Sequence, residues 1–390
     1  MMNFDFPRQT RIIFGENAEK KVGALLNEYG FRKVLLVYGG GSIKSNGLYD
    51  DVVTSLREAG VMYSELGGVA ANPDVSFVEE GLKIIRETPV DCVLAVGGGS
   101  VIDVAKCIAV NYFYGGDAYD FNSHKAVPSK ALPVSVILTI ASSGSESSDS
   151  CVINSNKTHE KSGFNSYLVR PLFAIENPYL LKSVPLRQRN AGIVDMMMHS
   201  IERYFAKSEP GQLSDEFALS LIKNVKETAY KLLSDPNDID SLANLMLDST
   251  LAHNGITSIG KKTRFVVHPL EHAMSAYRPK IIHGEGIAVA YLGWAKYAYK
   301  EDLEKFAAFA RRIFDIKEEN DSKAAIMGIE AMRRFYIDLS VPTTLGQLGL
   351  FEKDIPELSR IATGNGTRVI GCCPRSLNQE DVEAVYRLCL

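Results

Sequence analysis

The segment CVLAVGGGSVIDVAKCIAV, residues 92–110, joins a short apolar run to three glycines and then to a stretch with helical spacing of apolar residues. The earlier segment KVLLVYGGGS, residues 33–42, repeats the apolar run and the glycines. A strand that ends in a glycine turn and continues as a helix is typical of a parallel sheet covered by helices. We therefore predict an α/β fold built around strands 33–38 and 92–96.

The alternation of strand and helix continues around these two segments. Residues 133–140 predict a further strand. Residues 48–59 and 74–86 carry apolar residues at three- and four-residue spacing, which predicts helices that pack one face on the sheet.

The second half of the chain has a different pattern. Strand signals nearly vanish after the turn-rich segment 177–185, and long amphipathic stretches predict helices over residues 213–233, 240–259 and 301–313. We expect two domains, which are an α/β nucleotide-binding domain over residues 1–185 and an all-helical metal-binding domain over residues 186–390.

Composition narrows the classes of function. The 390 residues carry a formal net charge of −4, which is too mild for the basic surface that nucleic-acid binding needs. The longest apolar run, residues 286–295, is about half the length of a membrane-spanning helix, and the first residues lack the apolar core of a signal peptide. The six cysteines show no zinc or disulfide spacing and predict reduced, mostly buried thiols. We expect a cytoplasmic protein without nucleic-acid or membrane partners.

The two glycine turns predict an anion site. Glycines let backbone N–H groups approach a phosphate closely, and the N-terminus of the following helix favours negative charge. A single such turn after a buried strand has a purely structural explanation as often as a binding role, but two on one sheet favour a nucleotide. Neither turn has the G-x-G-x-x-G pattern of the standard dinucleotide fold.

A third polar segment, TIASSGSES (139–147), follows the predicted strand 133–140 and could close the same nucleotide site. The first glycine turn has no acidic residue before Asp50 to bind an adenosine ribose. It has Ser42 and Lys44 instead, and a hydroxyl with an ammonium suits a 2′-phosphate. We therefore predict NADP(H) over NAD(H).

Histidines are concentrated in the second half. Three of the seven, His268, His272 and His283, lie within sixteen residues, while Asp195 and His199 are four residues apart on a predicted helix and so share one face. Titratable groups among so many apolar neighbours are costly to bury unless they pair or coordinate, so we predict a divalent metal site. One carboxylate oxygen with imidazole nitrogens suits iron(II), zinc, cobalt or nickel, and the residues alone do not rank these ions.

The other histidines carry no such pattern. A lone histidine on an apolar helix is more often a satisfied core residue, which we expect for His253. His124 and His159 are expected in surface loops.

Four segments in order carry a family resemblance: GGGSVIDVAK (97–106), TIASSGSE (139–146), GIVDMMMHSIE (192–202) and HPLEHAMSAYRPKIIHGEG (268–286). They resemble the hallmark segments of the iron-containing (group III) alcohol dehydrogenase family. Two further segments, YGGGSIKSNGLYD (38–50) and LNQEDVEAVY (377–386), resemble its butanol dehydrogenase branch. The resemblance covers essentially the whole chain, and it implies a dehydroquinate-synthase-like architecture with the catalytic cleft between the two domains.

The resemblance also implies roles for individual residues. The metal it implies is iron(II), with zinc a frequent substitute. The implied ligands are Asp195, His199, His268 and His283. His272 is expected to face the substrate without ligating the metal, and we assign catalytic roles to His272 and Asp103. The implied cofactor-binding residues are Gly39, Gly40, Gly41 and Ser42 at the adenosine end, Gly97, Gly98, Gly99 and Ser100 at the pyrophosphate, Asp103, Thr139 and Ser142 nearer the nicotinamide, and Lys161 beside the cofactor.

The expected function is a metal-dependent NAD(P)H-linked alcohol dehydrogenase or aldehyde reductase that acts on a small, butanol-like primary alcohol or aldehyde. The alternatives are a dehydroquinate-synthase-like lyase, a polyol (glycerol) dehydrogenase on the same fold, and a non-catalytic nucleotide-binding protein. The alternating N-terminal segment FDFPRQTRIIF (4–14) could extend a sheet edge, and an exposed edge of this kind favours a homodimer.

Overall fold

The computed structural model describes residues 4–158, 160–208 and 212–390. These residues form two compact units, one of which is Pro7–Val184. The other is Pro185–Leu390 together with residues 4–6 at the N-terminus. The division lies one residue before the predicted boundary, while the N-terminal residues group with the helical unit. Which ligand each unit binds stays a prediction.

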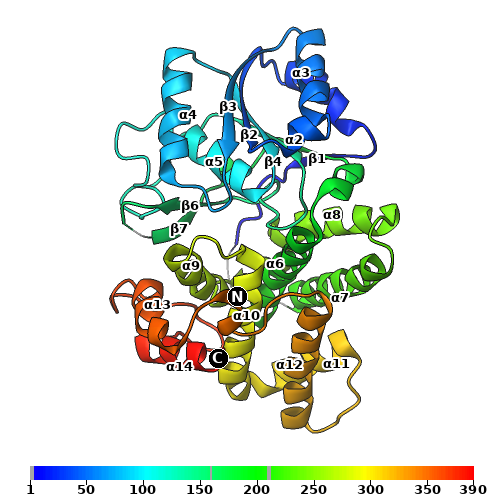
Figure 1. The fold of residues 1–390 in the computed structure, drawn as a ribbon, viewed down its shortest axis with the longest axis vertical. Helices are drawn as coiled ribbons and strands as arrows, with labels where there is room; N and C mark the ends of the chain where they lie inside the picture. Colours follow the sequence, from blue (N-terminus) through cyan, green and yellow to red (C-terminus); the bar gives the residue numbers. More distant parts are fainter. Residues whose placement is uncertain (1–3, 159, 209–211) are drawn as a thin grey trace. The chain divides into compact units, whose positions relative to one another are not determined.

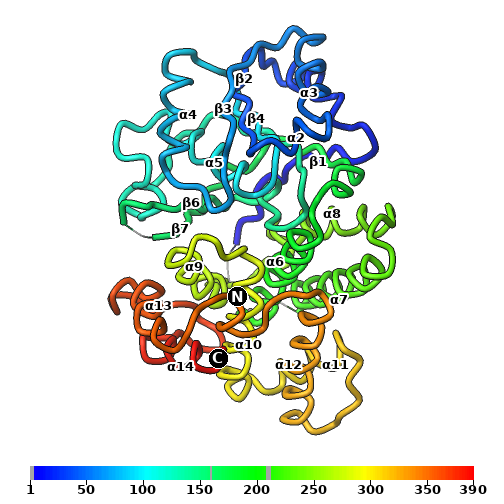
Figure 2. The backbone as a smooth tube through the Cα atoms, viewed as in Figure 1, coloured from blue at the N-terminus to red at the C-terminus, as the bar shows by residue number. Residues whose placement is uncertain are grey.

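A six-stranded sheet forms the centre of the first unit (Figures 1 and 2). Its strand order is β1-β8-β5-β4-β2-β3. All neighbouring strands in it are parallel. The strands are β1 (Arg11–Phe14), β2 (Lys33–Gly39), β3 (Met62–Val69), β4 (Cys92–Gly97), β5 (Val134–Leu138) and β8 (Phe173–Glu176). The three strands predicted from the sequence are β2, β4 and β5, which are adjacent in the interior of the sheet. They form continuous apolar runs because helices cover both faces of a parallel sheet.

Helices lie on both sides of this sheet. α1 (Val22–Glu28) and α3 (Leu48–Glu58) share an apolar cluster with alternate residues of the strands, such as Leu36 and Leu94. α4 (Val75–Glu87) contacts β3 and packs on α5 (Gly99–Asn111). Figure 1 shows α3 and α4 on opposite sides of the strands. The predicted helices 48–59 and 74–86 are confirmed to within one residue at each end.

A two-stranded antiparallel hairpin, β6 (Ser150–Ser155) and β7 (Glu160–Asn165), follows β5 in the chain and was not predicted. Both strands contain asparagine, and β7 also contains glutamate, lysine and glycine, all of which are depleted in strands. β3 and β8 were also missed. Tertiary pairing, which is not visible in local composition, makes these segments strands.

The second unit is almost entirely helical, as predicted. The helices are α6 (Leu186–Phe205), α7 (Gln212–Ser234), α8 (Ile239–His253), α9 (Val267–Tyr277), α10 (His283–Ala298), α11 (Leu303–Phe314), α12 (Asp321–Asp338), α13 (Ile355–Ala362) and α14 (Gln379–Arg387). The described residues of this unit also form a short antiparallel ribbon, β9 (Lys207–Ser208) with β10 (Lys261–Lys262), and an isolated antiparallel bridge between Ile370 and Leu377. The predicted helix 240–259 is too long, because α8 ends at His253 and Gly255 follows in the left-handed region with φ 101°.

The apolar run 286–295 lies inside α10, where Trp294 is 2% exposed. Figure 2 shows α10 beside both α6 and α9, although α6 ends at Phe205 and α10 begins only at His283. Among the described helices, none is both long and apolar enough to cross a bilayer. β1 is an outermost strand of the sheet, and the expected homodimer stays a prediction.

Candidate metal centre

α6 supplies the first two residues of the centre. Asp195 and His199 are four residues apart on this helix, and their side chains are 2% and 4% exposed. The helix is buried almost continuously from Ala191 to its end, so both polar groups lie inside the unit. Their shared face follows from the helical repeat, as the sequence predicted.

α9 and α10 bring the next two residues to the same place. His268 lies in the first turn of α9, and α10 begins at His283. Gly284 explains how closely α10 approaches α6, because a Cβ at this position would lie 1.9 Å from the carbonyl oxygen of Ala191. Only glycine permits this contact, which places His283 beside Asp195.

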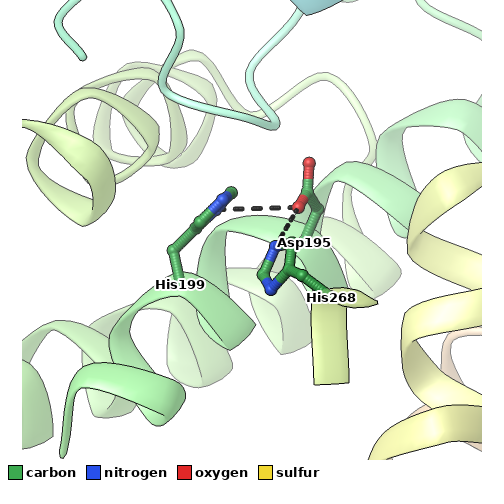
Figure 3. Close-up of side chains that lie close together, drawn as sticks. All are labelled: Asp195, His199 and His268. Atoms are coloured by element: carbon green, nitrogen blue, oxygen red, sulfur yellow. Dashed lines mark ion pairs between the residues drawn. The ribbon is translucent and has the colours of Figure 1, made fainter. Parts of the chain in front are cut away.

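One carboxylate oxygen is the meeting point of three imidazoles. Asp195 Oδ1 lies 3.6 Å from His199 Nδ1, 3.6 Å from His268 Nε2 and 3.7 Å from His283 Nε2. Figure 3 shows His199 and His268 pointing at the Asp195 carboxylate. Donor atoms that share a tetrahedral ion at roughly 2.1 Å lie roughly 3.4 Å apart. Each of the three imidazoles therefore lies at a distance from Asp195 Oδ1 that two ligands of one ion can have, and the role of all four residues as ligands stays a prediction.

The polar atoms of this cluster fit a divalent metal. His199 Nδ1 and His268 Nε2 are buried and have no hydrogen-bond partner in the described part of the chain. Asp195, His199 and His268 offer ligand atoms that all lie within 4.8 Å of one another. One oxygen and imidazole nitrogens are a donor set that suits iron(II) or zinc.

Two buried glutamates, which the sequence analysis did not single out, hold the outer nitrogens of two histidines. Glu202 Oε2 pairs with His268 Nδ1, and Glu271 Oε2 pairs with His283 Nδ1. Such carboxylates fix the tautomer and the ring orientation of metal-binding histidines. Glu202 lies seven residues after Asp195 on the same helix face, which is a weak signal that sequence analysis could have used.

The electrostatics of the cluster differ between its histidines. Burial lowers the pKa of His199 well below its usual value, and the neighbouring His253 and His268 act in the same direction. Burial also opposes charge on His268, but the carboxylates of Glu202 and Asp195 outweigh it and raise the pKa of His268 to about 9.

His253 does not lie where we expected. It is half-buried, and its ring centroid lies 4.0 Å from that of His199, so it belongs to the surroundings of the cluster rather than to a separate core. Phe265 also contacts the cluster, with its ring 4.9 Å from that of His268. His124 is exposed, as expected for a surface loop, whereas His159 lies outside the described residues.

His272 lies at the edge of the cluster. It is half-buried, and its ring centroid is 5.5 Å from that of His283 and 6.3 Å from that of His268. Glu271, His272 and His283 also offer atoms within 4.8 Å of one another. His272 thus lies beside two of the predicted ligands, His268 and His283.

The two glycine turns and Thr139, which are predicted to bind the cofactor, lie at the carboxyl edge of the parallel sheet. The glycines of the first turn follow β2 and those of the second follow β4, which is its neighbour in the sheet. Thr139, directly after β5, donates its backbone N–H to the carbonyl of Gly97 at 3.1 Å. The carboxyl edge of an open parallel sheet is the usual ligand-binding edge of such folds.

Close packing explains two glycines of the second turn. A Cβ on Gly98 would lie 2.2 Å from Ile140 Cγ2, and one on Gly99 would lie 2.4 Å from Ser143 Oγ. The loop 139–147 therefore lies directly on this turn, and its role in closing a nucleotide site stays a prediction. Ser100 lies in the first turn of α5, and Ser142 is half-buried in the loop.

Asp103 has a clear structural role in this unit. Its Oδ1 accepts a hydrogen bond from Ser145 Oγ at 2.7 Å, and its Oδ2 accepts one from the backbone N–H of Val152 at 3.1 Å. Burial raises the pKa of Asp103, although Lys106 opposes this effect. Asp103 thus links α5 to the loop 139–147 and to β6 through hydrogen bonds.

Lys161, which is predicted to lie beside the cofactor, donates from its Nζ to Asn72 Oδ1 at 3.1 Å.

The first turn carries a group of aromatic and charged side chains. Lys44 Nζ lies 5.0 Å from the ring centroid of Tyr38 and 4.8 Å from that of Tyr49. Both phenol hydroxyls donate hydrogen bonds to Glu65, at 2.9 and 2.5 Å. The cation of Lys44 therefore lies over the rings of Tyr38 and Tyr49, and Lys44 belongs to α2 (Ser42–Ser45), which Ser42 begins.

Comparisons with known proteins agree with this geometry. A family model described as iron-containing alcohol dehydrogenase matches residues 9–178, and a model of the C-terminal part of the Fe-containing alcohol dehydrogenase family matches residues 190–390. The chain is 38% identical to the probable NADH-dependent butanol dehydrogenase 1 of Bacillus subtilis over 100% of both chains. It is 33% identical to the NADPH-dependent aldehyde reductase YqhD of Escherichia coli over 95% of both chains. The crystal structure of NADH-dependent butanol dehydrogenase A from Thermotoga maritima matches with a TM-score of 0.95 at 35% identity, covering 100% of this chain and 99% of that one.

Proposed function

Because the chain belongs to the iron-containing alcohol dehydrogenase family and is an NAD(P)-dependent oxidoreductase, we propose that it interconverts small, butanol-like primary alcohols and their aldehydes. Its relatives are named butanol dehydrogenase and aldehyde reductase, which favours this reaction over the lyase and polyol alternatives. A bound nicotinamide cofactor would supply the hydride chemistry of this reaction.

The meeting of three imidazoles at Asp195 Oδ1 is the observation that carries the proposal. Asp195, His199, His268 and His283 would hold the ion, which we propose to be iron(II) or zinc. When bound, the ion supplies Lewis acidity that stabilises negative charge on the substrate oxygen. The glutamates behind His268 and His283 keep these rings oriented, so the ligand geometry does not need to reorganise.

His272 is our candidate for proton transfer. It is half-buried, unlike the buried His199 and His268, so its imidazole has access both to the cluster and to solvent. A histidine in this position can hold or release the proton of a substrate hydroxyl near neutral pH. The catalytic role of Asp103 also stays a proposal, and it would act by holding the loop 139–147 against the second glycine turn.

Replacement of the proposed ligands tests this function. We expect His268→Ala and His283→Ala to lose bound metal and to abolish turnover, because each removes one of four donors. Metal content is measured by elemental mass spectrometry, and turnover is measured by the change in NAD(P)H absorbance. Circular dichroism shows whether each variant is folded. His124→Ala, at an exposed loop position, is the matched control and should keep both properties. A folded His268→Ala protein with full metal content would overturn the ligand assignment.

We propose NADP(H) as the preferred cofactor. Lys44 and Ser42 are both residues of α2, which directly follows the first glycine turn, and an ammonium with a hydroxyl suits a 2′-phosphate. The names of the relatives do not decide between the two cofactors, since the Bacillus protein is named as NADH-dependent and the Escherichia coli protein as NADPH-dependent.

The test of this preference is Lys44→Ala. We expect KM for NADPH to rise about 10- to 100-fold, from the loss of a charged hydrogen bond worth about 1.5–3 kcal/mol, and KM for NADH to stay nearly constant. Lys182→Ala is the matched control, because Lys182 Nζ also lies 5.0 Å from a tyrosine ring centroid, that of Tyr179, in the same unit. Wild-type protein that uses NADH far better than NADPH contradicts the proposal.

A further inference from the structure

Two neighbouring cysteines differ from the rest. Cys372 and Cys373 are half-buried, whereas the other cysteines are buried: Cys92, Cys107, Cys151 and Cys389. The Sγ atoms of the neighbouring pair lie 3.4 Å apart. Adjacent side chains of an extended segment point in opposite directions, so the local fold must bring these two sulfurs together.

The loop that carries the pair is closed and packed. Ile370 and Leu377 exchange two backbone hydrogen bonds, of 3.0 and 2.9 Å, across its base. Ser376 Oγ donates to the carbonyl of Gly371 at 3.2 Å. Gly371 has φ 67°, and a Cβ there would lie 2.1 Å from Val266 Cγ2. The loop therefore rests directly on the segment that leads into α9.

Both sulfurs face the backbone of the β9–β10 ribbon and its continuation. The backbone N–H of Lys207 donates to Cys373 Sγ at 3.1 Å. The thiol of Cys372 lies 3.7 Å from the carbonyl oxygen of Lys262 and 3.9 Å from that of Arg264. These contacts hold the two sulfurs on one side of the loop, so little side-chain freedom remains to be lost when they bind a common atom.

We propose that Cys372 and Cys373 form a vicinal dithiol site that binds one trivalent arsenic atom, from arsenite or a monoorganyl arsenical, through two As–S bonds. Trivalent arsenic is a soft centre, and soft centres prefer sulfur ligands. Its pyramidal geometry holds two bound sulfurs at non-bonded contact, which is the separation seen here. A linear two-coordinate ion such as copper(I) needs its sulfurs farther apart.

The binding reaction is a condensation. With phenylarsine oxide, two S–H bonds and the arsenic–oxygen bond break, two As–S bonds form, and the oxygen leaves with both protons as one water molecule. Arsenic stays trivalent, so no oxidant is consumed. Burial and the neighbouring Cys373 raise the pKa of Cys372 to about 11, and the condensation starts from such a protonated thiol.

The test is the stoichiometry of phenylarsine oxide bound to the purified full-length protein, measured by intact mass. We expect one arsenical per chain, retained in excess mercaptoethanol and removed by the small dithiol dimercaptopropanol. Because the second As–S bond forms within one molecule, Cys372→Ser and Cys373→Ser should each weaken binding by at least about 100-fold. Cys107→Ser is the matched control, since Cys107 contacts Cys151 in a second but buried pair, and it should bind as the wild type does.

A second measurement needs no variant. Protein treated with the arsenical is unfolded and alkylated, and its peptides are mapped; Cys372 and Cys373 should be protected while the other cysteines are alkylated. Native protein that binds no arsenical, binding that survives in both serine variants, or protection at Cys107 and Cys151 instead would each overturn the site.

Discussion

At the scale of single residues, Glu202 connects two parts of the metal centre. Its carboxylate accepts hydrogen bonds from the backbone N–H groups of Val267, at 2.7 Å, and His268, at 3.3 Å, and it pairs with the His268 ring. It therefore satisfies donors at the start of α9 and also orients a proposed ligand. A single buried carboxylate thus controls both the helix end and the ring.

This position predicts the effect of Glu202→Gln. Loss of the negative charge behind His268 should weaken metal binding by about 10- to 100-fold, because loss of a carboxylate that orients a metal ligand usually has an effect of this size. The dissociation constant is measured by competition with a chelator. Glu330→Gln, in an exposed ion pair with Arg333 on α12, is the control and should bind metal normally. Equal metal affinity in both variants would show that Glu202 does not support the ligand.

At the scale of elements, the second glycine turn lets the loop 139–147 pack directly on the junction of β4 and α5, because Gly98 and Gly99 have no side chains there. Gly98 has φ −93°, which any residue can adopt, so its need for glycine is purely steric. The conflicting atom is Ile140 Cγ2, in the loop that follows β5.

Gly98→Ala should therefore destabilise the protein by about 1–3 kcal/mol, the usual cost of overpacking. The free energy of unfolding is measured with urea. Gly40→Ala is a matched control in the first turn, because a Cβ there meets nothing within 4 Å, and its effect should stay within about 0.5 kcal/mol. Equal stability of the two variants would mean that Ile140 moves aside freely and that the close approach is not required.

At the scale of the whole molecule, a buried carboxylate in α8 should make stability depend on pH. Asn224 Nδ2 donates to both oxygens of Asp248 at 2.9 Å. Burial raises the pKa of Asp248 to about 7, although the bond from Asn224 lowers it. An unfolded aspartate has a pKa of about 3.9. Between these values the folded protein keeps a proton that the unfolded chain releases, so the contribution to stability falls as pH rises from about 4 to 7 and is constant above.

Asp248→Asn removes this dependence. We expect the variant to be more stable than the wild type at pH 8, by roughly 1–4 kcal/mol, and the gain to shrink as the pH is lowered toward 4. Thermal and urea unfolding across this pH range measure the difference. Asp235→Asn, at an exposed position, is the control and should show no such trend. A gain that is the same at every pH would contradict a titrating Asp248.

The amino-acid sequence by itself determined the fold class, and it predicted the candidate ligands through the family resemblance. β2, β4 and β5 were predictable because each is a short apolar run that ends at glycine, polar residues or proline. Asp195 and His199 were recognisable because the helical repeat places residues four apart on one face. These signals are local, so a single chain segment contains them.

Only the tertiary structure decided which groups meet. Glu202 pairs with His268, which is 66 positions away in the chain. Gly284 lets α10 approach α6 closely. The sulfurs of Cys372 and Cys373 lie close together because a closed loop carries both residues. The segments of the β6–β7 hairpin become strands through pairing rather than composition. The physical reason is that side-chain contacts between distant segments depend on packing, and no local periodicity encodes their partners.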